Sequence, residues 1–133
     1  MFAANSALAK SSKEARLTSG AYNGNYWTSI KDKEKLDYLS GFMDALNVVD
    51  SFNEDSKRLK LLKGGFTYGQ IKDYADKFYS KKKNRPIPLA YVIFGFAPNA
   101  LSGELSESAE DSVVDKMLEE MKSGSIQPQE TSE

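Results

Sequence analysis

The 133-residue sequence contains no cysteine and no histidine. Without cysteine, disulfide bonds and thiolate metal sites are excluded. Without histidine, the chain lacks the most common general base and the most common metal ligand. No apolar run approaches the roughly 20 residues that a membrane-spanning helix needs. We therefore expect no transmembrane segment, and we expect little of the chemistry on which most catalytic and metal sites depend.

The sequence also lacks the motifs that mark common catalytic sites. It contains no nucleophile elbow, phosphate loop, dinucleotide fingerprint or metal-binding helix motif. Asp73 and Asp76 stand one helical turn apart, but without a clear third ligand an ordinary charged helix face explains them better than a cation site. The sequence therefore indicates a protein that is not an enzyme and that has no cofactor, no catalytic residue and no metal site.

Charge is nearly balanced over the whole chain but unevenly distributed along it. Residues 54–85 carry ten Lys or Arg and four Asp or Glu, whereas residues 100–133 carry two and nine. Two solvated faces of opposite sign are the favoured interpretation; the alternatives are attraction between the two segments or a competing partner. The basic run 81–85 is short, and complementing a helix dipole explains it, so we expect no nucleic-acid partner.

The most clearly defined element is a helix that starts at Thr67. Thr67 and Gln70 have the spacing of a capping box, in which each side chain bonds to the backbone amide of the other residue. Apolar side chains then recur at the helical period, at Ile71, Tyr74, Ala75, Phe78 and Tyr79. Lysines 81–83 fill the predicted last turn. Pro86 is expected to stop the helix, because the residue before a proline is pushed out of the α region.

Residues 89–97 form the most apolar segment of the chain. Such a run fits a buried strand as well as a buried helix. Pro86 and Pro88 suit the first turn of a helix and Pro98 suits its end, so a helix is favoured. A helix that is apolar on every side needs cover all round, which predicts that this one forms the centre of the bundle.

A second amphipathic helix is expected after the cap-like pair Ser29 and Asp32. Its apolar stripe comprises Leu36, Leu39, Phe42, Met43, Leu46 and Val49. Gly41 interrupts this helix at a cost of up to about 1 kcal/mol relative to Ala, which suggests close approach by another helix or an aromatic ring. Asp44 is interpreted either as a paired, partly buried carboxylate or as a solvent-facing one.

The two ends of the chain differ in character. Residues 7–9, Ala-Leu-Ala, have the form of a signal-peptidase site, so residues 1–9 are interpreted as a signal-peptide remnant of a periplasmic or secreted protein; a frayed terminus is the alternative. Residues 108–122 are expected to form an acidic amphipathic helix that Gly124 ends. This helix could dock on the bundle, pair with a copy of itself, or fold only with a partner. Residues 125–133 are expected to be disordered.

Two shorter segments carry further expectations. Residues 21–27 place Asn23-Gly24 between aromatic residues, which is a hairpin cue, but the flanks are short and a loop that packs on the core is expected rather than a sugar- or partner-binding platform. Arg85 follows Asn84 at the hinge before Pro86. Its guanidinium could bridge helix-end carbonyl groups and a carboxylate on a neighbouring helix, Asp44 or Asp73, as a structural clamp. Arg85→Ala is then expected to lower the melting temperature by several degrees.

Three segments in order, 35–44, 67–71 and 78–88, resemble a group of small exported bacterial helical proteins. The shared motifs are Gly41-Phe42-x-Asp44 in a helix, the Thr67-x-x-Gln70 start, and the Asn84-Arg85-Pro86-Ile87-Pro88 junction. More loosely, the chain is similar to the Rap/Tai immunity proteins of type VI secretion, which use a comparable order of helices. The resemblance covers about Trp27 to Ala97, and it implies an all-helical fold and an immunity-like protein partner.

Taken together, these patterns predict an all-α protein, a small bundle of three to four main helices with a flexible acidic C-terminal segment. Residues 1–26 are expected to be the signal-peptide remnant and a loop, 27–100 the helical core, and 101–133 the acidic helix and tail. We expect a protein–protein interaction module with an unknown partner and oligomeric state. The alternative is a module that binds a small apolar or anionic ligand between the Gly41 helix and the Tyr74–Tyr79 face.

The candidate residues fall into two groups. Those expected to contact a ligand or partner are Phe42, Asp44, Tyr74, Phe78, Tyr79 and Arg85. Those expected to be structural are Gly41, Thr67, Gln70, Asn84, Pro86 and Pro88. A cavity lined by Phe42, Tyr74 and Phe78 would favour the ligand module, a wide exposed apolar patch would favour a protein partner, and two acids converging in a cleft would favour an enzyme.

Overall fold

The computed structural model describes residues 22–52, 62 and 65–124. Its elements are α2 (Gly24–Trp27), α3 (Asp32–Asp50), α5 (Tyr68–Ser80), the 3₁₀ turn η1 (Lys82–Asn84), the π-helix η2 (Tyr91–Phe96), α6 (Ala97–Leu101) and α7 (Glu107–Ser123). The predicted all-α class is confirmed. Residues 1–9, predicted to be a signal-peptide remnant, and residues 125–133, predicted to be a disordered tail, lie outside the described residues. No helix within the described ranges has both the length and the apolar character to cross a bilayer.

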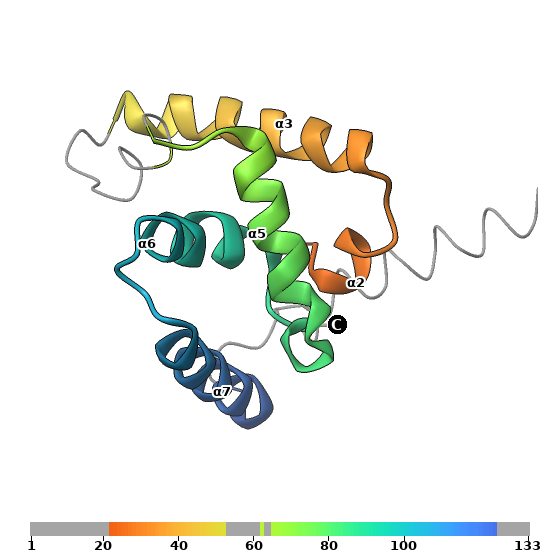
Figure 1. Ribbon diagram of the computed structural model, residues 1–133, viewed down its shortest axis with the longest axis vertical. Helices are drawn as coiled ribbons and strands as arrows, with labels where there is room; N and C mark the ends of the chain where they lie inside the picture. Colours follow the sequence, from red (N-terminus) through yellow and green to blue (C-terminus); the bar gives the residue numbers. More distant parts are fainter. Residues whose placement is uncertain (1–21, 53–61, 63–64, 125–133) are drawn as a thin grey trace, which may run out of the picture.

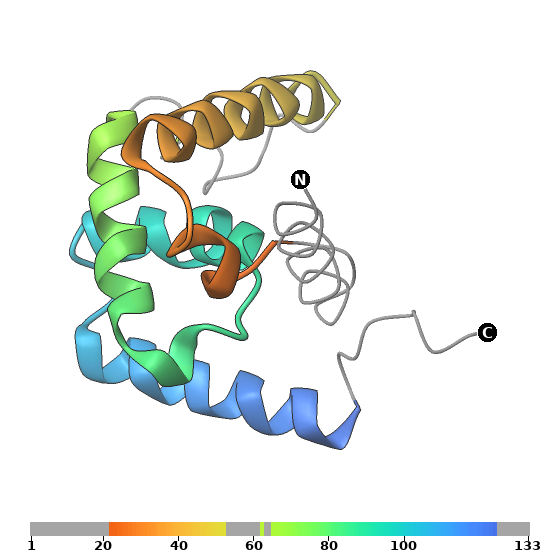
Figure 2. The same ribbon diagram turned by 90° about the vertical axis from the view of Figure 1, so that its right-hand side faces the viewer.

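The helices are arranged around α5. Figures 1 and 2 show α5 running from α3 at one end of the molecule to α7 at the other, with η2 and α6 in the layer between them. Buried side chains from every layer form one core, which includes Trp27, Leu39, Ile71, Phe78, Val92, Ile93 and Val114. Because Val114 belongs to α7, the acidic helix docks on the bundle, one of the three alternatives that the sequence left open.

The start of α5 is as predicted. Gln70 Oε1 accepts from the Thr67 amide at 2.9 Å, and Thr67 Oγ1 accepts from the Gln70 amide at 3.1 Å, which completes the capping box. The predicted end is wrong, because α5 stops at Ser80 and leaves the lysines outside it. Pro86 does not end the helix either, because the residue before it, Arg85, keeps α-region angles (φ −62°, ψ −31°).

Side chains beyond the helix satisfy its last carbonyl groups instead. Asn84 Nδ2 donates to the Phe78 carbonyl oxygen at 2.8 Å, and Arg85 Nε donates to that of Tyr79 at 3.3 Å. Helix ends leave carbonyl groups without intrahelical partners, so these two bonds stabilise the termination. Asn84 is fully buried, and its structural role is clear.

The expectations for α3 need two corrections. The helix begins at Asp32 with Lys31 as its cap residue, and Glu34 accepts a hydrogen bond from the Lys31 amide at 3.1 Å. Ser29 is not the cap; its hydroxyl donates to the Tyr26 carbonyl oxygen. Gly41 does not permit a close approach, because a Cβ added there would meet nothing within 4 Å.

The close approach occurs at Gly24. A Cβ there would lie 2.3 Å from Tyr79 Cδ1 and 2.8 Å from the Arg85 Cα, so α2 packs directly on the end of α5. Within the segment expected to be a loop, Gly24–Trp27 forms a one-turn helix, which the Asn23 side chain caps by accepting from the Asn25 amide. The predicted packing role holds for Trp27, which is fully buried.

The apolar run is helical, as favoured, but it is not one α-helix. The amide of Ala97 bonds to the Val92 carbonyl oxygen, the wider π register of η2. This register change places Pro98 in the first turn of α6, where its missing N–H costs little. The helix therefore continues through Pro98 to Leu101, and the expectation that Pro98 ends it is wrong. Pro88 does precede the helix, and its carbonyl oxygen accepts from the Tyr91 amide.

Helix α7 is close to its predicted span. Ser106 caps it by accepting from the Ala109 amide at 3.2 Å. Gly124 follows it with a left-handed φ of 89°, the conformation that glycine adopts most easily, so the predicted stop is confirmed.

Candidate binding pocket between α5, α6 and α7

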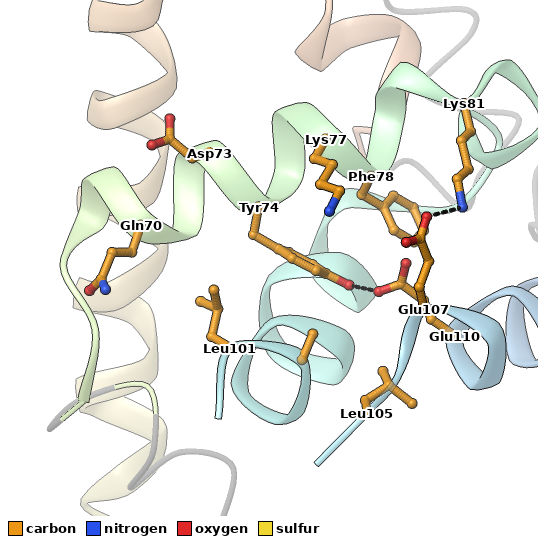
Figure 3. Close-up of a pocket in the computed structure, with 11 residues that line it drawn as sticks. Gln70, Asp73, Tyr74, Lys77, Phe78, Lys81, Leu101, Leu105, Glu107 and Glu110 are labelled. Carbon is orange, nitrogen blue, oxygen red and sulfur yellow. Dashed lines mark hydrogen bonds and ion pairs between the residues drawn. The ribbon is translucent and has the colours of Figure 1, made fainter. Parts of the chain in front are cut away.

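A cavity of about 450 Å³ lies between α5, α6 and α7 (Figure 3). Its apolar lining comes from Tyr74, Phe78, Ala100, Leu101 and Leu105. Its polar lining comes from Gln70, Asp73, Lys77, Lys81, Glu107 and Glu110. Although six of these eleven residues are polar, most of the surface exposed inside the cavity is apolar, and a cavity of this size and character is typical of small-molecule sites.

One hydrogen bond crosses the pocket. The Tyr74 hydroxyl on α5 donates to Glu110 Oε1 on α7, as Figure 3 shows. Burial, followed by this bond to Glu110, raises the pKa of Tyr74, so the hydroxyl remains a donor at neutral pH. Glu110 is only 8% exposed, and no lysine or arginine of the described ranges lies within ion-pair distance of it. The pocket therefore holds a nearly buried carboxylate with one hydroxyl partner.

Two lysines line the pocket in different states. Lys81 Nζ lies 3.1 Å from Glu107 Oε2 and 3.0 Å from Asp111 Oδ1, so its charge is already neutralised. The Lys77 side chain points into the cavity (Figure 3), and it has no carboxylate partner in the described part of the chain. Of these two ammonium groups, only that of Lys77 is available to a ligand.

Ion pairs hold the hinge after α5 against α7. We call the set Lys81, Lys83, Glu107, Asp111 and Asp115 the charge clamp. Besides the Lys81 pairs, Lys83 Nζ lies 3.0 Å from Asp115 Oδ1. The hydrogen bond from Lys81 is the largest cause lowering the pKa of Asp111. At these residues the basic and acidic segments attract each other, which is the alternative that the sequence did not favour.

A second charged cluster joins α2, α3 and α5. Asp76 accepts hydrogen bonds from Trp27 Nε1, Lys35 Nζ and Lys72 Nζ, each at 2.8 Å. Burial alone would raise the pKa of Asp76, but the bonds from Lys35, Lys72 and Trp27 outweigh it and lower the pKa. Lys35 also lies 5.4 Å from the centre of the Trp27 ring. Since these groups satisfy one another, the cluster is structural and no part of the pocket.

Two of the six predicted contact residues, Tyr74 and Phe78, line the pocket. Phe42 lies half-buried on α3, where its ring packs against that of Tyr38. Asp44 is exposed, which is the solvent-facing alternative. Tyr79 is fully buried, and its hydroxyl donates to the Ile87 carbonyl oxygen at 2.6 Å, so its position is structural.

Arg85 makes one of the two contacts expected of it as a bridge between a helix end and a carboxylate. It binds the Tyr79 carbonyl oxygen, but within the described ranges it pairs with neither proposed carboxylate. Asp73 pairs instead with Lys72, at 3.2 Å. Among the residues expected to be structural, Gln70 also lines the pocket besides capping α5.

The sequence reasoning missed Lys77 and Glu110. A signal for Glu110 was present, because it stands four residues before Val114 and seven before Met117, on the apolar stripe of α7. A carboxylate on such a stripe faces the protein. Lys77 had no comparable signal, since it lies among charged residues that the helical period places outward.

No three acidic side chains in the described ranges are grouped so as to hold a metal ion. Comparison with known proteins gave no match to any family model, curated protein or solved structure. The resemblance to Rap/Tai immunity proteins therefore stays a prediction from sequence.

Proposed function

We propose that this protein is a non-catalytic binding module whose site is the pocket between α5, α6 and α7, and that the ligand is a small molecule with an apolar body. The cavity itself carries the proposal. Phe78, Leu101 and Leu105 offer apolar surface, while Lys77 and Glu110 offer polar groups at its edge. Catalysis is not proposed, because the chain has no histidine or cysteine to serve as base or nucleophile.

This ranking differs from the one that the sequence favoured. The sequence put a protein partner first and placed a ligand pocket between the Gly41 helix and the Tyr74–Tyr79 face. The cavity includes Tyr74 and Phe78 but not Phe42, and its other walls are α6 and α7. It supports the ligand alternative in a different location.

The uncharged fluorescent probe N-phenyl-1-naphthylamine tests the proposal. Its emission rises when it leaves water for an apolar site, so we expect saturable enhancement with the full-length protein. Ala100→Phe places a ring in the pocket and should abolish this binding. Ala45→Phe is the matched control, because Ala45 is exposed on α3, outside the pocket. Equal binding by both variants, or none by the wild type, would contradict the proposal.

A protein partner is the second candidate, and the end of α3 favours it. Val48, Val49 and Phe52 are exposed there, Phe52 to 85%. Exposed apolar patches of this kind often contact other proteins. An immunity-like role in the periplasm would fit both this patch and the predicted signal-peptide remnant.

The patch can be tested with a pull-down from the source cell envelope, using the wild type and a Val48→Ser, Val49→Ser, Phe52→Ser variant. A partner captured by the wild type and by an Ala45→Ser control should be lost from the triple variant. Capture that persists in the triple variant would exclude this surface.

A further inference from the structure

The side chain of Glu110 is nearly buried, yet only one of its carboxylate oxygens accepts a hydrogen bond within the described ranges, and the other is open to solvent in the pocket. A carboxylate can accept about four hydrogen bonds, and among the residues that the structure describes Glu110 accepts one, from the hydroxyl of Tyr74. Burying a charge without a counter-ion is unfavourable. A cationic group inside the pocket would relieve that cost.

The other charged residues of the pocket also favour a cationic ligand. Lys81 is occupied by the charge clamp, and Asp73 is paired with Lys72. Of the five charged residues that line the pocket, Lys77 and Glu110 are therefore the two that form no ion pair with the described part of the chain. Lys77 is a solvent-exposed residue, so water and salt screen its charge, whereas the buried Glu110 is screened much less. We therefore expect the charge of Glu110 to act on a bound ligand more strongly than that of Lys77.

We propose that the pocket selects an organic ammonium ion with an apolar body. The ammonium group donates to Glu110, and the body lies on Phe78 between the side chains of Leu101 and Leu105. The hydroxyl of Tyr74 points at Glu110 from the opposite wall and holds one of its carboxylate oxygens in place (Figure 3). This assignment rests on the proposed function and adds the sign of the ligand's charge, which the sequence had expected to be neutral or negative.

Three probes of one shape test the sign. 4-Phenylbutylammonium, 4-phenylbutanol and 4-phenylbutanoate share the same apolar body, and calorimetric titration into the full-length protein at pH 7 gives their dissociation constants. We expect the ammonium ion to bind at least about tenfold more tightly than the alcohol, and the carboxylate to bind most weakly. Equal binding, or tighter binding of the alcohol or carboxylate, would overturn the assignment of charge while supporting a pocket ligand. Binding of none of the three would overturn both.

Two variants locate the effect. Glu110→Gln keeps the acceptor for Tyr74 and removes the charge. It should therefore weaken binding of the ammonium ion by about 10- to 100-fold and leave binding of the alcohol unchanged. Lys77→Met removes a like charge and should strengthen ammonium binding. The proposal would be contradicted if Glu110→Gln bound the ammonium ion as tightly as the wild type, or if Lys77→Met bound it more weakly. Circular dichroism melting curves of both variants show whether the fold is retained.

Discussion

The hydroxyl of Tyr74 and the carboxylate of Glu110 form a hydrogen bond that links α5 to α7 across the pocket. Tyr74→Phe would leave a nearly buried carboxylate without this donor, and we expect unfolding free energy to fall by about 1–3 kcal/mol. Urea unfolding at pH 7 measures the loss. Glu110→Gln is the control, since its amide oxygen still accepts and no charge is left unpaired, so its loss should be smaller. A larger loss in the control would show that the charge of Glu110 has another partner.

The charge clamp should determine how firmly α7 docks. Lys81→Glu places like charges beside Glu107 and Asp111, and we expect faster amide hydrogen exchange in α7 with little change in α3. Adding Asp111→Lys should restore part of the protection.

Salt provides the control for this prediction. At 1 M salt the screening length falls to about 3 Å, so the difference in α7 hydrogen-exchange rate between the wild type and Lys81→Glu should become smaller. A difference that is independent of salt would indicate a packing effect rather than an electrostatic one.

Asp76 should make stability depend on pH. Its pKa in the folded state is lowered, so its ion pairs stabilise the protein fully above the unfolded-state pKa of about 4 and are lost as pH falls through the folded-state pKa. Asp76→Asn should therefore be less stable than the wild type at pH 7, and the gap should close in acid. Urea midpoints measured across this range test it, and parallel curves for the two proteins would be the contrary result.

Two glycines predict opposite outcomes for the same substitution. Gly41→Ala adds a methyl group in open space within a helix and should stabilise the protein by about 0.5–1 kcal/mol. Gly24→Ala forces a Cβ to 2.3 Å from Tyr79 Cδ1 and should destabilise it. Thermal melts of the two variants give the comparison, and a stabilising Gly24→Ala would contradict the observed packing of α2 on α5.

Local sequence patterns were sufficient to predict those features whose contacts are made between residues close together in the sequence. The capping box of Thr67 and Gln70 lies within one turn, and the stop at Gly124 depends on the backbone freedom of a single residue. The amphipathic period of 71–79 likewise reports directly which face is buried. For these features the sequence contains the whole cause.

The pocket required information that no local pattern holds. Its walls come from α5, α6 and α7, and its position depends on how α7 docks, which the charge clamp and the bond between Tyr74 and Glu110 establish across gaps of about 30 residues or more. The same is true of Gly24, whose close neighbours are Tyr79 and Arg85. The sequence by itself determined the helices and much of their buried faces, because those follow from the helical period and the caps. Only the tertiary structure decided which charges meet and where a cavity remains, because those depend on contacts between segments far apart in the chain.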